Sequence, residues 1–123
     1  MNKPQRYQAR VIQKEQFSSK VYLLTVQLDN PQTIAFTPGQ FLSVGVAPDA
    51  RRSYSIASSP SRNNTLDLLV DIAPGGPGSN FFIHEEVGSM ISFIGPMGKF
   101  VLEKEEGTIV FLATGTGVAP FKS

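Results

Sequence analysis

The chain has 123 residues, of which 11 are glycine, 9 are proline and 41% are hydrophobic, and its 11 lysines and arginines nearly balance 10 acidic residues. This composition predicts a folded domain rich in turns and argues against disorder. The absence of cysteine excludes disulfides, thiolate metal sites and cysteine nucleophiles within the chain, and a net charge of +1 lacks the dense positive surface of a nucleic-acid-binding protein.

Metal and membrane sites are also poorly supported by the sequence. The chain contains a single histidine, His84, which cannot form a multi-histidine metal site. The first ten residues mix charged and polar types, and no apolar run approaches the ~20 residues that a membrane-spanning helix needs. We therefore expect a soluble, cytoplasmic domain with no metal, no nucleic-acid partner and no membrane span.

Short segments that alternate apolar and polar residues, separated by turn residues, recur along most of the chain. This spacing is typical of small all-β barrels and sandwiches. Pro38-Gly39 predicts a type II turn before the third segment, because proline and glycine suit its two central positions. The segments expected to be strands are 7–16, 21–28, 41–46, 51–57, 65–72 and 90–94, with a further extended stub at 100–102.

One short helix is expected between the fifth and sixth strands. Residues 79–86 follow a Gly/Pro cluster, with Ser79 as the N-cap and Gly88 just beyond the end. One member of the Phe81-Phe82 pair should pack this helix against the sheet. Gly95-Pro96-Met97-Gly98 predicts a turn after the sixth strand.

The pattern changes near the C-terminus. The charged segment 103–107 has the composition of a linker, and the continuous apolar run 108–113 predicts a strand buried on both faces. Gly115-Thr116-Gly117 follows, so the order is strand, glycine-rich turn and helix start, as in nucleotide-binding βαβ units of roughly 30 residues or more. We expect a barrel domain over 1–106 and the start of a truncated second domain over 107–123.

Two clusters could together bind a ligand that has a planar ring and phosphates. Arg52-Ser53-Tyr54-Ser55 offers a guanidinium and an aromatic ring, and strand alternation places Arg52 and Tyr54 on one face and the two serines on the other. Gly75-Gly76-Pro77-Gly78-Ser79 opens the expected helix, where backbone N–H groups and the helix dipole favour an anion. Taken alone, each cluster is more commonly an ordinary edge strand or a capped loop.

The ordered set of motifs resembles the ferredoxin-NADP reductase-like flavoproteins. Pro38-Gly39-Gln40-Phe41 resembles the family's PGQ motif, Arg52-Ser53-Tyr54-Ser55 its R-x-Y-S/T flavin signature, and Gly76-Pro77-Gly78-Ser79 its pyrophosphate turn. Segments 95–100 and 113–120 resemble the family's junction with its pyridine-nucleotide domain. The resemblance covers nearly the whole chain.

The resemblance implies an all-β fold, a six-stranded antiparallel Greek-key barrel with one short helix, followed by the first strand of a truncated α/β domain. It implies FAD as the cofactor and NADH or NADPH as the hydride donor of the full-length oxidoreductase. The acceptor would be an electron-transfer protein such as ferredoxin or an oxygenase component. This part alone is expected to be inactive, with the chemistry belonging to the flavin and no catalytic side chain in the chain.

The resemblance also implies roles for particular residues. Arg52 would bind the FAD pyrophosphate, Tyr54 would lie against the isoalloxazine and ribityl portion, and Ser55 would lie near the reactive N5 edge. Thr116 would approach the flavin and the nicotinamide from the second domain. The other expected cofactor contacts come from the signature strand, the backbone at the end of the fifth strand and the pyrophosphate turn: Ser53, Leu69, Val70, Asp71, Ile72, Gly76, Pro77, Gly78 and Ser79.

Two other functions remain open from the residues alone. One is a barrel that binds single-stranded nucleic acid, with Arg51, Arg52 and Tyr54 as a stacking and phosphate platform. The other is a partner-docking barrel that keeps the motifs but retains no flavin. Flavin binding distinguishes both from the leading hypothesis.

Overall fold

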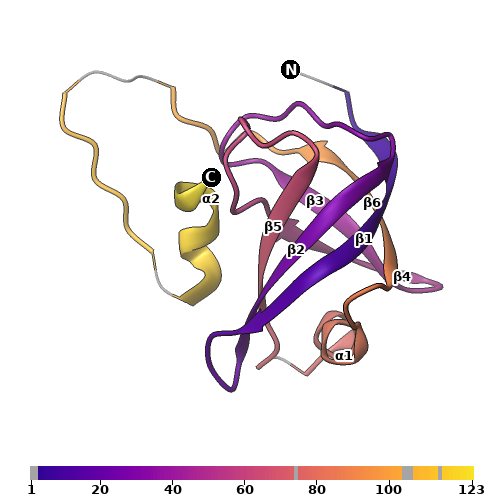
Figure 1. The fold of residues 1–123 in the computed structure, drawn as a ribbon. Coiled ribbons are helices and arrows are strands. Elements are labelled where there is room, and N and C mark those ends of the chain that lie inside the picture. Colours follow the sequence, from indigo (N-terminus) through magenta and orange to yellow (C-terminus); the bar gives the residue numbers. More distant parts are fainter. Residues whose placement is uncertain (1–2, 74, 104–106, 114) are drawn as a thin grey trace.

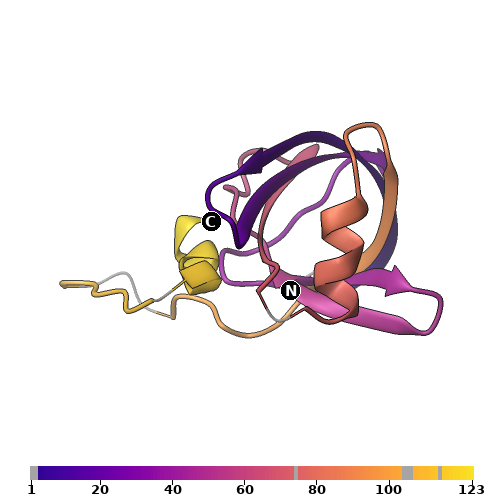
Figure 2. The same ribbon diagram turned by 90° about the horizontal axis from the view of Figure 1, so that it is seen from below.

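A computed structural model describes residues 3–73, 75–103, 107–113 and 115–123, and its main feature is a six-stranded antiparallel sheet that curls into a barrel (Figures 1 and 2). The sheet order is β4-β3-β6-β1-β2-β5. An isolated bridge between Ile56 and Leu68 joins the two edges of the sheet. The expected Greek-key barrel with one short helix is therefore confirmed. The strands are β1 (Gln5–Gln16), β2 (Val21–Asn30), β3 (Phe41–Ala47), β4 (Ala50–Ser55), β5 (Thr65–Asp71) and β6 (Met90–Met97).

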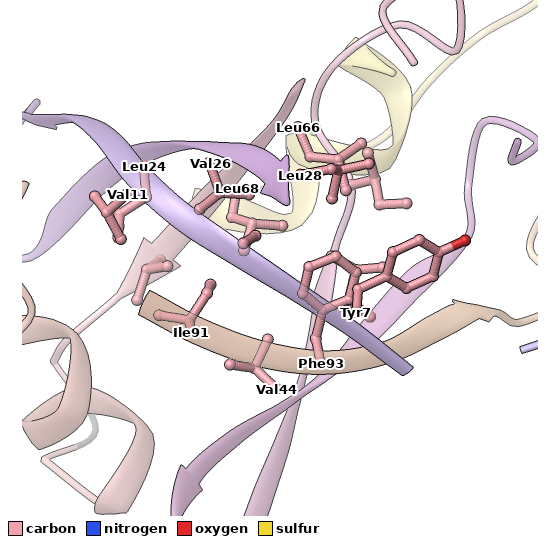
Figure 3. Close-up of a cluster of buried hydrophobic side chains, with 14 of the residues drawn as sticks. Tyr7, Val11, Leu24, Val26, Leu28, Val44, Leu66, Leu68, Ile91 and Phe93 are labelled. Carbon is pink, nitrogen blue, oxygen red and sulfur yellow. The ribbon is translucent and has the colours of Figure 1, made fainter. Parts of the chain in front are cut away.

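The barrel interior is filled by the inward-facing residues of these alternating strands (Figure 3). Aromatic rings fill part of this interior, where Tyr7 on β1 stacks on Phe93 of β6 with ring centroids 5.1 Å apart. Full burial of each large apolar side chain contributes roughly 1.5–3 kcal/mol, so this interior is the main source of stability. Its labelled members are Tyr7, Val11, Leu24, Val26, Leu28, Val44, Leu66, Leu68, Ile91 and Phe93.

The turn before β3 has the geometry that the sequence predicts. The Gln40 N–H donates to the Thr37 carbonyl over 3.1 Å, and Gly39 has a φ of +104°, as the third residue of a type II turn requires. The side chain of Gln40 is buried and holds the turn in place. Its Oε1 accepts from the Thr37 N–H (2.9 Å), and its Nε2 donates to the Gly98 carbonyl (3.2 Å).

The predicted helix is present but begins earlier than expected. Helix α1 spans Pro77–His84, its N-cap is Gly76, and Ser79 lies inside the first turn instead of capping it. The N-cap prediction was wrong because proline, which lacks an N–H, suits the first helical position and starts the helix two residues sooner. Phe82 is the member of the aromatic pair that packs the helix on the barrel, since it is fully buried.

Each predicted strand also differs from the observed one at one or both boundaries, by one to three residues. The predicted turn at 95–98 is wrong, because β6 continues through Gly95 to Met97 and pairs there with β1 and β3. The end of β4 comes at Ser55 because Ile56 crosses to β5, where the Ala57 N–H donates to the Asp67 carbonyl (2.8 Å). Residues 100–102 form no strand.

The C-terminal segment lies against the outside of the barrel beside β5 (Figure 1). It consists of the 3-10 helix η1 (Gly115–Val118) and the short helix α2 (Ala119–Lys122). The strand predicted at 108–113 is absent, because no neighbouring strand in the described chain pairs with this run, and its apolar side chains are exposed. Residues 104–106 of the predicted linker and Thr114 of the glycine-rich turn lie outside the described residues.

Within the described residues, no helix has the length and apolar character needed to cross a membrane.

Candidate functional site

Strand β4 presents its signature residues on two different faces. Arg52 pairs opposite Val44 and Tyr54 opposite Leu42, and both partners are buried in the barrel core. Directly opposed residues share a face of an antiparallel sheet, so Arg52 and Tyr54 lie on the inner side. Ser53 and Ser55 pair opposite Ser43 and Phe41 and therefore lie on the outer side, as the alternation predicts. 

Arg51 lies on the outer side as well, which weakens the nucleic-acid alternative. It pairs opposite Gly45, and its Nε donates to the Ser43 hydroxyl over 2.9 Å. Arg51, Arg52 and Tyr54 therefore do not share one face and do not form the single platform that this alternative requires.

The start of α1 lies directly against the inner face of β4. A Cβ atom at Gly78 would overlap the hydroxyl of Tyr54 and lie 3.2 Å from Cγ of Arg52. No larger residue fits at this position without displacing its neighbours. The two sequence clusters, at 52–55 and 75–79, thus meet at one point, and the contact depends on glycine.

The first turn of α1 leaves backbone donors available to a ligand. Gly76 makes no side-chain cap hydrogen bond, and the first helical bond runs from the Asn80 N–H to the Gly76 carbonyl (3.0 Å). The N–H groups of Gly78 and Ser79 precede it and have no acceptor within the helix. The buried Ser79 hydroxyl accepts from the Gly75 N–H (3.2 Å) and so fixes the loop that leads into the helix.

Charge and aromatic character at this point suit an anionic ligand with a planar ring. Both ion pairs in the described part of the chain involve Asp67, so the exposed Arg52 guanidinium has no carboxylate partner there. Tyr54 is half-buried and meets Phe82 edge to face at 4.9 Å. Burial raises the pKa of Tyr54, an effect that the charge of Arg52 partly opposes, and the phenol remains a hydrogen-bond donor at neutral pH.

Strand β5 offers backbone groups on the same side of the barrel. One edge of β5 pairs with β2 along its whole length, whereas the other edge meets the β4 side only around the Ile56–Leu68 bridge. Beyond that bridge, no strand in the described chain pairs with this edge at 69–71. A ligand lying along this edge can therefore reach peptide groups of β5 that pair with no strand of the described chain.

The side chains at the end of β5 are occupied elsewhere, so only its backbone suits the expected role. Leu69 packs outward in a cluster with Ala119, whereas Val70 belongs to the barrel core. The Asp71 carboxylate accepts from the Ala73 N–H (2.9 Å), and the Ile72 N–H donates to the Lys20 carbonyl (2.8 Å). The family resemblance implies cofactor contacts from these peptide groups, and the arrangement is compatible with them.

Thr116 lies on η1, which packs beside β5, and its side chain is half-buried. Just after η1, Ala119 of α2 packs with Leu69 and Ala57 and so holds α2 against the barrel. The structure therefore places Thr116 near β5 but not in contact with Arg52 or Gly78 in any described interaction.

A separate apolar pocket of about 380 Å³ lies away from these residues, between the 37–39 turn and the C-terminal segment. Phe100, Phe111 and Phe121 supply its aromatic walls. It contains neither Arg52 nor the α1 start, and so it is not the anion site.

The barrel and its site define a domain for a cofactor with both a ring and a phosphate chain. Three features fit the pyrophosphate of FAD: the cradle at Gly78, which a Cβ would fill, the open first turn of α1, and the guanidinium of Arg52, which has no carboxylate partner among the described residues. A family model described as an oxidoreductase FAD-binding domain matches residues 8–102. The chain belongs to this family, and FAD is the cofactor of the domain.

Individual relatives agree with this assignment. The toluate 1,2-dioxygenase electron transfer component of Pseudomonas putida is 34% identical over 117 residues, which is 94% of this chain and 34% of the relative. Ferredoxin–NADP reductase B of Sorangium cellulosum is 32% identical over 122 residues, or 95% of this chain and 50% of that protein. The chain thus spans between about a third and a half of these relatives.

Among solved structures, the cytochrome P450 reductase GcoB of Amycolatopsis superposes with a TM-score of 0.88 and 28% identity. The match covers 97% of this chain and 37% of GcoB.

Proposed function

We propose that this chain is the FAD-binding part of an NAD(P)H-dependent reductase that passes electrons to a protein acceptor. Bound FAD supplies hydride and one-electron chemistry that no side chain of the barrel provides. The seating of Gly78 between Tyr54 and Arg52 carries the proposal, because it brings an aromatic face, a cation and an open helix start to one place.

In this proposal each site residue has a defined task. Arg52 pairs with the pyrophosphate, and the turn Gly76-Pro77-Gly78-Ser79 holds it from the other side through the backbone N–H groups of its non-proline residues. Tyr54 lies against the isoalloxazine and ribityl portion, and Ser55 lies near the N5 edge. The peptide groups of Leu69-Val70-Asp71-Ile72 contact the ring or the ribityl chain along the open edge of β5. Ser53 contributes a further cofactor contact from the signature strand, and Thr116 approaches from the second domain.

The relatives support a proposal for the partners of the whole protein. The names of the relatives include electron transfer components of dioxygenases and a ferredoxin–NADP reductase. We therefore propose NADH or NADPH as the electron source, an oxygenase component or ferredoxin as the acceptor, and a cytoplasmic location. Residues 1–106 would be the FAD domain and 107–123 the start of the pyridine-nucleotide domain.

A flavin titration with two neighbouring arginine variants tests the proposal. The chain is titrated with FAD and, separately, with riboflavin, and quenching of flavin fluorescence gives each dissociation constant. Arg52→Ala removes a charge-assisted contact worth about 1.5–3 kcal/mol, which weakens FAD binding roughly ten- to hundredfold. Riboflavin has no phosphate, so its binding should not change.

Arg51→Ala is the matched control, because it removes the same charge from the adjacent residue on the opposite face. It should leave FAD binding unchanged. Absence of saturable FAD binding by the parent chain would contradict the proposed function of this domain. Equal FAD affinity in Arg52→Ala and the parent would contradict the role given to Arg52.

A further inference from the structure

Lys14 on β1 makes an unusual set of contacts with the far end of the helix that starts at the FAD site. Its Nζ donates to three backbone carbonyls at the end of α1: Phe82 (2.8 Å), Ile83 (3.1 Å) and Glu85 (2.9 Å). An ammonium has three N–H donors, so all of them are used. The same Nζ lies 4.8 Å from the ring centroid of Tyr22.

A bulge in β1 explains why a lysine can reach this position. Tyr7, Ala9 and Val11 face the core in strict alternation, which would next direct position 13 inward. The β1–β2 register shifts between Val11 and Gln13, and Lys14 then pairs opposite the core residue Leu24. Bulges re-aim side chains in this way. The shift therefore directs Lys14 toward the end of the barrel that α1 covers.

Helix α1 depends on outside contacts because eight residues are too few for a stable isolated helix. Three contacts fix its orientation. Gly78 meets β4 at the N-terminal end, Phe82 enters the core near the middle, and Lys14 holds the C-terminal carbonyls. The N-terminal end of α1 has no side-chain cap hydrogen bond, whereas the C-terminal end is anchored by the side chain of Lys14.

We infer that Lys14 is a positioning residue for the pyrophosphate site: it fixes the tilt of α1 and thereby the direction of the first-turn N–H groups at Gly78 and Ser79. The inference rests on the proposed function, since it takes this turn to be where the phosphates bind. The positive charge of Lys14 lies at the C-terminal end of a helix, where the helix dipole adds electrostatic stabilisation to the three hydrogen bonds. Without it, α1 can pivot about Phe82, and the cradle at Gly78 opens.

Lys14→Met tests this role, since methionine keeps much of the apolar stem and loses the ammonium. We expect FAD affinity to fall about three- to tenfold, riboflavin affinity to stay unchanged, and Lys14→Arg to recover most of the loss. The backbone amide NMR signals of Gly78 and Ser79, at the other end of the helix, should shift in the flavin-free Lys14→Met chain and return toward their parent positions in Lys14→Arg.

Two controls separate positioning from charge and from general destabilisation. Lys99→Met removes the same charge from an exposed residue, and Arg10→Met removes a β1 cation that bonds the Gly88 carbonyl (2.8 Å) beyond the helix. Neither should alter FAD affinity or the two amide signals. Unshifted Gly78 and Ser79 signals in Lys14→Met would overturn the inference, as would equal losses of FAD and riboflavin binding. A parent chain that binds no FAD would refute the proposed function, and the amide signals would still decide whether Lys14 sets the geometry of the turn.

Discussion

Gly78 is seated against the hydroxyl of Tyr54 with no space for a Cβ atom between them. The contact joins the first turn of α1 to the inner face of β4, which also carries Arg52. Because the turn supplies N–H donors and the strand supplies a cation and a ring, this one glycine sets the spacing between the two halves of the proposed site.

Gly78→Ala should therefore weaken both the fold and the site. Overpacking at this contact should lower the free energy of unfolding by about 1–3 kcal/mol and weaken FAD binding, as measured by urea denaturation and flavin titration. Gly117→Ala is the stability control, because a Cβ there would make only an ordinary contact of 4.0 Å with the Cβ of Ala113 and the backbone does not have a positive φ.

Rescue gives a sharper test of the same contact. Tyr54→Phe removes the hydroxyl that a Cβ at Gly78 would overlap, so the free energy of unfolding of Gly78→Ala should partly recover in the double variant. Additive losses in the double variant would show that the hydroxyl of Tyr54 does not limit the space at Gly78.

The sequence was sufficient for the barrel, the type II turn and the separate site clusters, because each has a local pattern. Alternation predicts that Arg52 and Tyr54 share a face, and proline followed by glycine predicts the turn at Pro38. The contact between Gly78 and Tyr54 has no such pattern, since it depends on how the helix packs across the barrel end. The bulge that turns Lys14 inward and the continuation of β6 through Gly95 are likewise products of strand pairing.

Phe82 should be the most sensitive aromatic residue of α1. Its ring is fully buried and meets both Tyr54 and Phe81 edge to face, at 4.9 and 5.0 Å. Phe82→Ala should lower the free energy of unfolding by about 3–5 kcal/mol, whereas Phe82→Leu should cost much less. Phe17→Ala is the control, because Phe17 is 56% exposed and its loss should change stability by less than about 0.5 kcal/mol. Equal effects at the two positions would contradict the packing of α1 described above.

Two tyrosines should make the fold sensitive to alkaline pH. Burial raises the pKa of Tyr7 and that of Tyr54 above the ordinary value of 10.0. For Tyr54, the positive charge of Arg52 opposes part of this increase. The folded chain then keeps protons that the unfolded chain has released. The stabilisation from these phenols is complete below pH 10.0 and is lost as the pH rises through the raised pKa values.

Tyr7→Phe checks this dependence, since phenylalanine preserves the stacking on Phe93 and removes the titrating group. Urea denaturation is measured between pH 8 and pH 11, a range that brackets the ordinary tyrosine pKa of about 10. The free energy of unfolding should fall less steeply with pH in Tyr7→Phe than in the parent. The double variant with Tyr54→Phe should be shallower still. Parallel pH profiles for parent and variants would contradict the link between these phenols and alkaline unfolding.

Gln40 should tolerate replacement poorly although it is neither apolar nor part of the flavin signature. The residue is 2% exposed, and its amide joins the Thr37 N–H to the Gly98 carbonyl, so it ties the turn before β3 to the chain after β6. Gln40→Leu keeps the approximate size of the side chain but leaves both backbone groups without this partner. We expect a loss of about 1–3 kcal/mol in the free energy of unfolding.

Gln40→Glu retains the acceptor toward Thr37 but sets a carboxylate against the Gly98 carbonyl. This variant should recover stability as the pH is lowered, because the protonated carboxyl group regains a donor. Gln13→Leu, at an exposed position of β1, is the control and should change stability by less than about 0.5 kcal/mol. If urea denaturation gave the same value for Gln40→Leu and Gln13→Leu, the two hydrogen bonds of Gln40 would not be what holds this turn to the barrel.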